Sequence, residues 1–188
     1  MPVFFGYSYD FIDEFSLGFS NRENIINIIC SNKKNNHKYD LYRNRRDIID
    51  WYSKKESAVF SYYGNGWEYL VLHGGILSSI FNRLRVPAKY FNRVYSTYGG
   101  ILDEKKTVLT KTRFSFTLEN AVGYKSYLTE KIFDAMQYGA VPVYLGATEI
   151  TNLIPENCFI DMRKFNDLSD LHYYLMNMTE QEYIEIQK

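Results

Sequence analysis

The stretch that decides the fold is RFSFTLENAVGYKSYLTEKIFDAMQYGAVPVYLG, residues 113–146. Residues 113–120 alternate in polarity as a β-strand does. The next segment, from about Tyr127 to Tyr138, carries a helical apolar stripe, and Gly139 is a natural helix stop. This stripe consists of Leu128, Ile132, Ala135 and Met136. AVPVYLG then predicts a second buried strand, so the order strand, helix, strand predicts a parallel pair joined by a right-handed crossover.

A similar unit lies upstream. IINIIC, residues 25–30, is a continuous β-branched run, which is typical of a strand buried on both faces. A helical stripe then predicts a helix from about Leu41 to Lys55, with Leu41, Ile48, Ile49 and Tyr52 on the buried side. The Gly-rich turn at 64–66 ends a further short alternating run. We therefore expect an α/β fold, a Rossmann-like parallel sheet with flanking helices.

The C-terminal segments predict one more short strand and two helices. NCFIDM, which begins at Asn157, reads as the strand. SDLHYYLMNM reads as a helix with Ser169 as its cap. Thr179 and Glu182 have the spacing of a capping box, which predicts a last helix over 179–188.

Composition narrows the class of protein. The chain has 188 residues, which suits one domain, and its formal net charge is +0, which argues against a nucleic-acid partner held by bulk charge. Cys30 and Cys158 lie in apolar runs and are expected to be reduced thiols. His37, His73 and His172 lie far apart and near no acid cluster, so no metal site is expected. The sequence has no signal-peptide pattern and no membrane-spanning run, so a cytoplasmic location is expected.

Polar side chains gather where the strand over 113–120 meets the helix that follows it. In open α/β sheets ligands bind at the carboxyl edge, where strand ends meet helix starts. The amides of a helix start favour phosphate, and a carboxylate suits ribose hydroxyls or a developing positive charge. The alternative interpretation needs no ligand: Thr129 is a plain helix cap, Glu130 a partner of the helix dipole and Lys131 a solvated surface residue. The residues concerned are Asn120, Tyr127, Thr129, Glu130 and Lys131.

The upstream unit presents a comparable junction. Asn32 follows the strand over 25–30, and Arg43, Arg45 and Arg46 open the next helix. Arginine is suited to bidentate phosphate contacts, although a solvated basic face is the alternative interpretation. Two such junctions on one sheet edge predict a pocket for a nucleotide diphosphate. The sequence carries neither the G-x-G-x-x-G fingerprint nor a P-loop.

These residues resemble the alpha-1,3-fucosyltransferase family, glycosyltransferase family 10. The motifs that carry the resemblance are ENA (119–121), YLTEK (127–131), GAVPVYLG (139–146) and PENCFID (155–161). IICSNKK, RNRRDIIDWY and YYGNGW also look like the first unit of the family's donor domain, so the resemblance covers roughly residues 25–178. The family usually carries an arginine in a Y-R-G element, where this chain has Gly99.

The resemblance implies transfer of fucose from GDP-fucose to a glycan hydroxyl with inversion. It implies the C-terminal half of a GT-B glycosyltransferase: an arm or interdomain linker over 1–24, a GDP-fucose-binding donor domain over 25–178 and a C-terminal helix over 179–188. Arg45 would contact the diphosphate, and the donor pocket would be completed by Asn32, Asn120, Tyr127, Glu130 and Lys131. Glu130 would act catalytically by opposing positive charge on the fucosyl carbon.

The implied partners are GDP-fucose as donor substrate, with no cofactor, and a glycan acceptor. In the family the catalytic base lies in an N-terminal acceptor domain, and no motif marks Asp10, Asp13 or Glu14 for that role. The chain is therefore expected to be membrane-peripheral or paired with such a domain. Two alternatives remain open: a non-catalytic nucleotide-sugar-binding fragment, and another inverting glycosyltransferase that uses a different sugar nucleotide.

Overall fold

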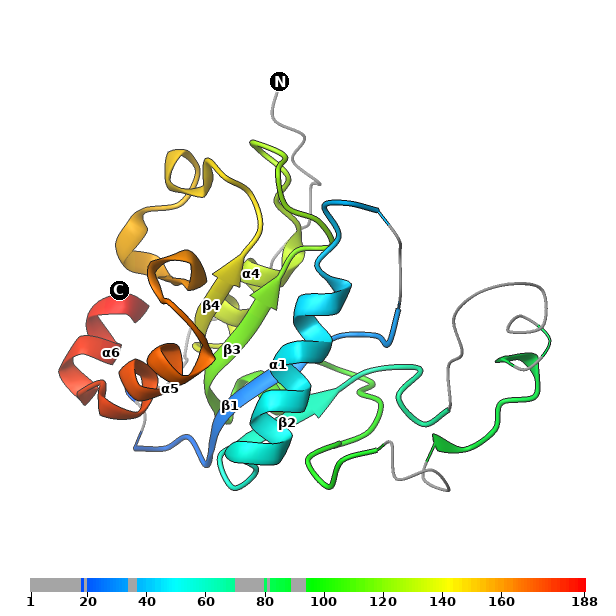
Figure 1. Ribbon diagram of the computed structural model, residues 1–188. Helices are drawn as coiled ribbons and strands as arrows, with labels where there is room; N and C mark the ends of the chain where they lie inside the picture. The colour runs from blue at the N-terminus through cyan, green and yellow to red at the C-terminus, as the bar shows by residue number, and fades with distance from the viewer. Residues whose placement is uncertain (1–17, 19, 34–36, 70–79, 81, 89–93) are drawn as a thin grey trace.

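A computed structural model describes residues 18, 20–33, 37–69, 80, 82–88 and 94–188. Its centre is a five-stranded sheet in the order β2-β1-β3-β4-β5, in which every neighbouring pair is parallel (Figure 1). The strands are β1 Asn24–Ile29, β2 Phe60–Tyr63, β3 Thr112–Leu118, β4 Val141–Leu145 and β5 Ile160–Asp161. The chain leaves β1 toward β2 and returns to β3 on the other side of β1, so the sheet has a topological switch point between β1 and β3.

Helices cover both faces of this sheet, which confirms the predicted Rossmann-like α/β fold (Figure 1). The helices that lie wholly within the described residues include α1 Tyr42–Lys55, α3 Lys106–Leu109, α4 Glu130–Gln137, α5 Leu168–Asn177 and α6 Glu180–Gln187. Short 3-10 turns span Ile150–Asn152, Glu156–Cys158 and Met162–Lys164. In Figure 1, α1 lies in front of β1 and β3, whereas α4 lies behind β3 and β4.

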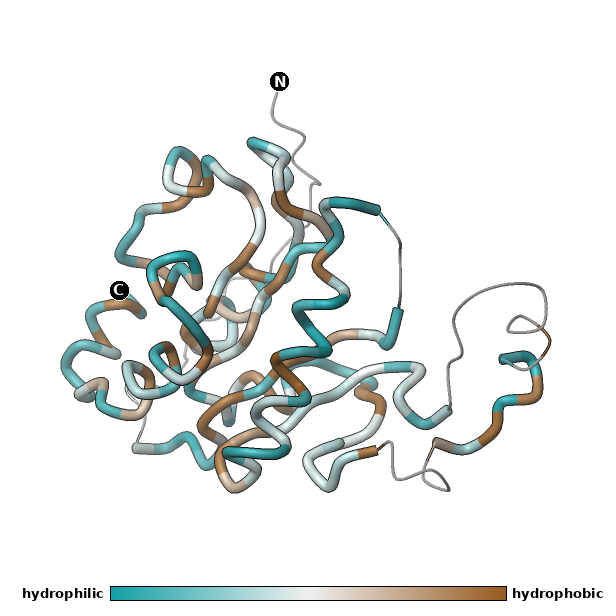
Figure 2. Tube along the Cα trace, in the orientation of Figure 1, coloured by the Kyte–Doolittle hydropathy of each residue, from teal (hydrophilic) through white to brown (hydrophobic). Residues whose placement is uncertain are grey.

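The larger core lies between the sheet and α1, α5 and α6. The predicted stripe of α1 is confirmed, because Ile48, Ile49 and Tyr52 are buried against the strands. The Tyr52 ring stacks on Phe60 at a centroid distance of 4.9 Å. Figure 2 shows brown and teal segments that alternate along α1, the hydropathy pattern of a helix with one buried side. This face therefore owes its stability chiefly to apolar burial.

The opposite face of the sheet is also covered by apolar side chains. Leu128 and Ile132 pack on Tyr144, and Ala135 packs on Leu109. As a consequence β3 is buried on both sides, and its polar positions find internal partners. Ser115 Oγ donates to Asn27 Oδ1 over 2.7 Å, which satisfies two groups that would otherwise be costly to bury.

Two predicted helix starts were wrong. We expected one helix to begin near Tyr127, but α4 begins at Glu130, so Tyr127 and Thr129 lie before its first turn. The reason is that the Thr129 amide and hydroxyl bond to a strand-end carboxylate, which keeps the preceding segment extended. The cap of α5 is Asp167, whose carboxylate accepts from the amides of Ser169 and Asp170, because it lies one residue before the helix whereas Ser169 lies inside it.

Two predicted helix ends are confirmed. Gly139 follows α4 with φ of 71°, a left-handed conformation that favours glycine. Thr179 and Glu182 form the expected capping box at α6. The Tyr183 side chain of α6 is fully buried and packs into the same core as α1.

The described residues of the expected N-terminal arm are tied to the rest of the fold. Buried Arg22 donates to the carbonyls of Leu109, Thr112 and Tyr138 at 2.8–3.1 Å. Asp10, Asp13, Glu14 and His73, in contrast, lie outside the described residues. In the part of the chain that the structure describes, no helix is both long enough and apolar enough to cross a bilayer. The two cysteines are free thiols.

Candidate functional site

A polar cleft of about 350 Å³ opens at the carboxyl edge of the sheet, at the switch point between β1 and β3. Segments that follow β1, β2 and β3 form its walls together with the first turns of α1 and α4. Its size is in the range of small-molecule sites. The polar side chains of the lining include Lys33, Arg45, Lys105, Asn120, Glu130 and Lys131.

Arg45 joins the start of α1 to the end of β3. Although the side chain is buried, its Nη2 donates to the carbonyls of Leu118 and Glu119, each over 2.8 Å, and to Asn120 Oδ1 over 3.0 Å. The guanidinium also lies over the Tyr42 ring, 5.0 Å from its centroid. Arg45 therefore brings a fixed positive charge to the cleft and holds its two walls together.

The second cation is organised by a buried acid. Glu119 has no exposed surface and accepts from the amide and hydroxyl of Thr129, over 2.8 and 2.7 Å. Lys131 Nζ lies 3.2 Å from the same carboxylate and donates to Thr129 Oγ1 over 2.8 Å. Because Thr129 and Lys131 flank the start of α4, this cluster fixes where the helix begins and where Lys131 points.

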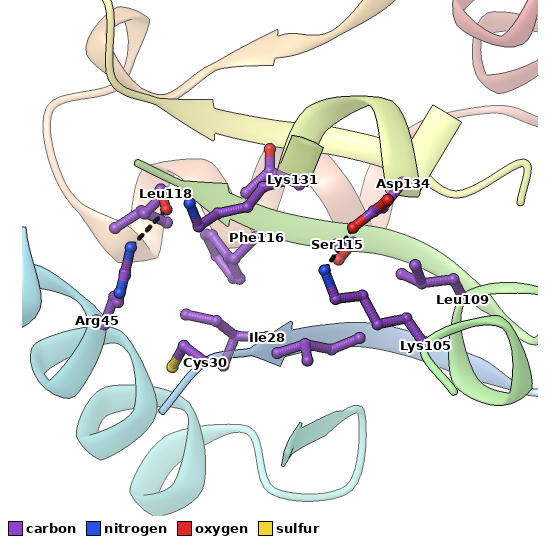
Figure 3. A pocket seen from close by; sticks show the side chains of 12 residues that line it. Ile28, Cys30, Arg45, Lys105, Leu109, Ser115, Phe116, Leu118, Lys131 and Asp134 are labelled. Atoms are coloured by element: carbon purple, nitrogen blue, oxygen red, sulfur yellow. Dashed lines mark hydrogen bonds and ion pairs between the residues drawn. The ribbon is translucent and has the colours of Figure 1, made fainter. Parts of the chain in front are cut away.

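A third cation comes from the segment before α3. Lys105 Nζ lies 2.5 Å from Asp134 Oδ2 and 3.9 Å from Glu130 Oε1. Glu130 and Asp134 are one turn apart on α4, so two like charges share one side of the helix. Lys105 compensates both, and Figure 3 shows it extending toward Asp134 while Arg45 enters from α1.

A small cavity of about 30 Å³ lies next to the cleft and is drawn in Figure 3. Its apolar walls are Ile28, Phe116 and Leu118 from the strands, and its polar groups include the same three cations. Cys30 belongs to both spaces, and burial raises the pKa of its thiol to about 12. Cys30 is therefore a neutral wall group near neutral pH.

Asn120 and Tyr127 meet as expected, beside the cleft. Asn120 Nδ2 donates to the Tyr127 hydroxyl over 3.3 Å, while its Oδ1 accepts from Arg45. Burial raises the pKa of Tyr127, although the bond from Asn120 opposes that shift. Asn120 lines the cleft as expected, whereas Tyr127 is not in the lining and contacts the cleft through Asn120.

The other residues predicted at the upstream junction lie elsewhere. Asn32 donates to the Gly66 carbonyl over 3.0 Å and so holds the turn after β2. Arg43 points into solvent near Asp47, and Arg46 donates to the Lys33 carbonyl. The expectation that all three arginines reach the sheet edge is wrong for Arg43, whereas Arg46 reaches the segment after β1 through Lys33 and Arg45 lines the cleft itself.

Four residues of the site were missed by sequence reasoning. Glu119 lies near the end of the predicted strand, but only the fold shows that it is buried against Lys131. Tyr42 and Lys33 flank predicted positions and were detectable as neighbours of Arg45 and Asn32. Lys105 had no such signal, since it reaches the cleft only because Leu109 of α3 packs against Ala135 of α4. Among the described residues, no group of three or more His, Cys, Asp or Glu side chains is arranged to hold a metal ion.

A parallel sheet with helices on both faces and a cationic cleft at its switch point defines a Rossmann-like domain, the architecture of one half of a GT-B glycosyltransferase. The model of glycosyltransferase family 10 (fucosyltransferase), C-terminal part, matches residues 84–185, which is more than half of the chain. The chain therefore belongs to the glycosyltransferase 10 family of fucosyltransferases.

Curated relatives agree with this assignment. An alpha-(1,4)-fucosyltransferase of Arabidopsis thaliana is 32% identical over 76 residues, which cover 40% of this chain and 19% of that protein. The 4-galactosyl-N-acetylglucosaminide 3-alpha-L-fucosyltransferase 9 of Mus musculus is 30% identical over 110 residues, or 52% of this chain and 30% of that protein. The matched part thus spans less than a third of either relative.

Solved structures show the same fold. A crystal structure of an alpha1,3-fucosyltransferase with GDP matches with a TM-score of 0.59 at 17% identity, covering 87% of this chain and 38% of that one. A second, with GDP-fucose, matches with a TM-score of 0.57 at 16% identity and the same coverage. At this identity the likeness establishes the fold.

Gly99 departs from the family pattern for a visible reason. A Cβ on Gly99 would lie 2.0 Å from Cε1 of Tyr63, so the Tyr63 ring occupies the space that an arginine side chain at this position would cross. Gly99 N also donates to the Tyr62 carbonyl over 2.9 Å. The loop that contains Gly99 is thus packed tightly against the end of β2.

Proposed function

We propose that this chain forms the donor-binding domain of a fucosyltransferase that transfers fucose from GDP-fucose to a glycan hydroxyl with inversion. The observation that carries the proposal is the cleft at the β1–β3 switch point, where Arg45, Lys105 and Lys131 converge in a chain of the glycosyltransferase 10 family. Structural neighbours are described with GDP and with GDP-fucose, which supports the choice of donor.

In this proposal the cations stabilise the leaving group. Departure of GDP leaves a new negative charge on the diphosphate, and preorganised positive charge lowers the energy of that state. Arg45 and Lys131 are held in place by Asn120 and Glu119, so little reorganisation is needed. The amides at the start of α4 add a partial positive charge. No resident cofactor takes part, and the donor is the substrate.

Glu130 is proposed to face the fucosyl carbon. Glycosyl transfer passes through an oxocarbenium-like state, and a nearby carboxylate opposes its positive charge. Glu130 lines the cleft, and its side chain is 29% exposed, so it is available to a ligand there. Asn120 completes the wall of this donor site, and it bonds to the Tyr127 hydroxyl.

The acceptor side is proposed to come from a second domain. Inversion needs a base that takes the proton of the acceptor hydroxyl. No described residue is assigned that role here; we propose that a paired acceptor domain supplies it together with the glycan site. The alternative function is a nucleotide-sugar-binding fragment without transfer activity, which the same cleft would serve.

Ligand-induced stabilisation tests the donor. GDP, GDP-fucose, GDP-mannose and a UDP-sugar are added separately, and the free energy of unfolding is measured. A ligand present at 100 times its Kd should add about 2.7 kcal/mol. We expect GDP-fucose and GDP to stabilise the chain and UDP-sugars to have little effect. Equal stabilisation by UDP-sugars would favour another sugar nucleotide, and no stabilisation by any of them would reject the donor site.

A transfer assay separates the enzyme from the binding fragment. Radiolabelled GDP-fucose is incubated with glycan acceptors and the chain, with and without an added acceptor domain. Transfer that depends on the added domain supports the enzymatic proposal. Donor binding without transfer in both cases supports the alternative.

A further inference from the structure

We propose that Lys105 is a third phosphate-binding cation of this cleft, held beside it by Asp134 until a diphosphate arrives. The inference deepens the proposed function and rests on it, because it names a binding residue for the same donor site. Neither the sequence pattern nor the family motifs described above point to Lys105. It emerges only from the contacts around α3 and α4.

The backbone of Lys105 is held by the core, whereas its side chain is held by carboxylates of α4. The Lys105 carbonyl accepts from the amides of Val108 and Leu109, over 3.2 and 3.0 Å. Val108 and Leu109 are themselves buried. The anchor of the side chain is therefore set by the core, while the side chain, 43% exposed, has room to turn within the cleft.

The three cations of the cleft differ in what holds them. Arg45 is bound by backbone carbonyls at the end of β3, and Lys131 by the fully buried Glu119. Both contacts are part of the fold, and breaking them is costly. Lys105 instead pairs with Asp134, and because the Lys105 side chain is 43% exposed against 21% for Lys131, solvent screens this contact more strongly.

Charge balance gives Lys105 its role. Glu130 and Asp134 place two negative charges beside the proposed diphosphate. An incoming diphosphate would be repelled by them unless a cation lay between. Lys105 is 2.5 Å from one carboxylate and 3.9 Å from the other, and it lines the cleft, so it is in the position to screen both.

Isothermal titration with GDP, inorganic pyrophosphate and guanosine tests the inference. The proteins are the wild-type chain, Lys105→Gln, Lys105→Arg and the control Lys106→Gln, which removes the same charge from an exposed neighbour in α3. We expect Lys105→Gln to weaken GDP and pyrophosphate about tenfold, the size of one charge-assisted hydrogen bond. Guanosine should be unaffected, Lys105→Arg should retain most of the affinity, and Lys106→Gln should match the wild type.

Asp134→Asn separates phosphate binding from a structural ion pair. If Lys105 binds phosphate, Asp134→Asn removes a competitor and a negative charge, so GDP should bind as tightly as in the wild type or more tightly. If the pair only stabilises α4, Asp134→Asn should weaken GDP as much as Lys105→Gln does. That second result would overturn the inference.

The outcomes also separate this inference from the proposed function. If pyrophosphate binding depends on Lys105 but GDP binds no more tightly than pyrophosphate, the phosphate-binding role of Lys105 is supported. The same result would contradict a guanosine nucleotide as the donor. GDP binding that is unchanged by Lys105→Gln would reject the role of Lys105 and keep the donor site. Failure of the wild-type chain to bind either ligand would overturn both.

Discussion

The carboxylate of Glu119, fully buried at the end of β3, lies 3.2 Å from the ammonium of Lys131 in the first turn of α4. The same carboxylate accepts from the amide and hydroxyl of Thr129. One acid therefore fixes both the start of a helix and the direction of a cleft cation. In this fold the end of a strand orients the residues that we propose to bind the donor.

Glu119→Gln should therefore lower both stability and donor affinity. The amide keeps the shape of the side chain but loses the charge that Thr129 and Lys131 contact. We expect the free energy of unfolding to fall by roughly 2–3 kcal/mol, the range for hydrogen bonds to charged groups. Urea denaturation measures this loss, and GDP titration measures the affinity.

Glu156→Gln is the matched control. Glu156 pairs with Lys164 on the surface, where both side chains are more than half exposed. Such a pair contributes less than about 1 kcal/mol. Similar losses in Glu119→Gln and Glu156→Gln would show that the buried cluster has no special role.

Arg45→Lys tests whether the guanidinium is needed as well as its charge. A lysine keeps the charge but cannot contact two carbonyls and Asn120 from one planar group. We expect a loss of about 1–3 kcal/mol in stability and a weaker affinity for GDP. Arg43→Lys, at a well-exposed position 3.9 Å from Asp47, should change neither quantity by much. Full GDP affinity in Arg45→Lys would contradict the assigned role.

Gly99→Ala should destabilise the chain, because its Cβ would lie 2.0 Å from the Tyr63 ring. Overpacking of this kind costs about 1–3 kcal/mol. A double-mutant cycle with Tyr63→Ala measures the coupling by thermal unfolding. We expect Gly99→Ala to cost much less when Tyr63 has been removed. An equal cost in both backgrounds would show that Tyr63 does not exclude larger residues from this position.

The contact of Asp161 with Arg163 predicts a pH dependence of stability. The Asp161 carboxylate accepts from Arg163 Nε over 2.8 Å and from Nη2 over 2.6 Å. Burial raises the pKa of Asp161, but the hydrogen bonds from Arg163 outweigh it, so the pKa is lowered overall. The ionised form thus stabilises the fold above the ordinary Asp pKa of about 3.9, and this contribution is lost as the pH falls through the lower folded-state value.

Asp161→Asn should accordingly cost about 1–2 kcal/mol at pH 7 and progressively less below about pH 4. Unfolding by urea at several pH values measures the difference between the variant and the wild type. Asp47→Asn, at a well-exposed position 3.9 Å from Arg43, should cost little at any pH. A constant cost of Asp161→Asn down to pH 2 would contradict the lowered pKa.

Most of the fold could be predicted from the sequence because its strands are continuous or alternating apolar runs. β4 reads as an unbroken apolar segment, β1 as an isoleucine run interrupted by Asn27, and Gly139 marks a helix end by its backbone conformation. The start of α4 was misplaced because a long-range contact with Glu119, ten residues before Thr129, overrides local helix propensity.

Part of the site could also be predicted from the sequence. Strand-end and helix-start positions follow from topology, so Asn120, Glu130 and Lys131 were found to line the cleft. Lys105 was not, because its place depends on how α3 packs. The choice of Arg45 over its neighbours needed only the helical phase of α1, a signal that was present in the buried positions Ile48 and Ile49.

The most direct test of the central claim is an amide chemical-shift map of the chain titrated with GDP. The account predicts that the largest changes cluster around the β1–β3 switch point, at Cys30, Lys33, Arg45, Asn120 and Lys131. A second pocket of about 320 Å³ beside β5, with Ile160, Lys164 and Tyr174 in its lining, serves as the internal control and should stay unchanged. Changes centred on that second pocket, or no changes at saturating GDP, would contradict the account.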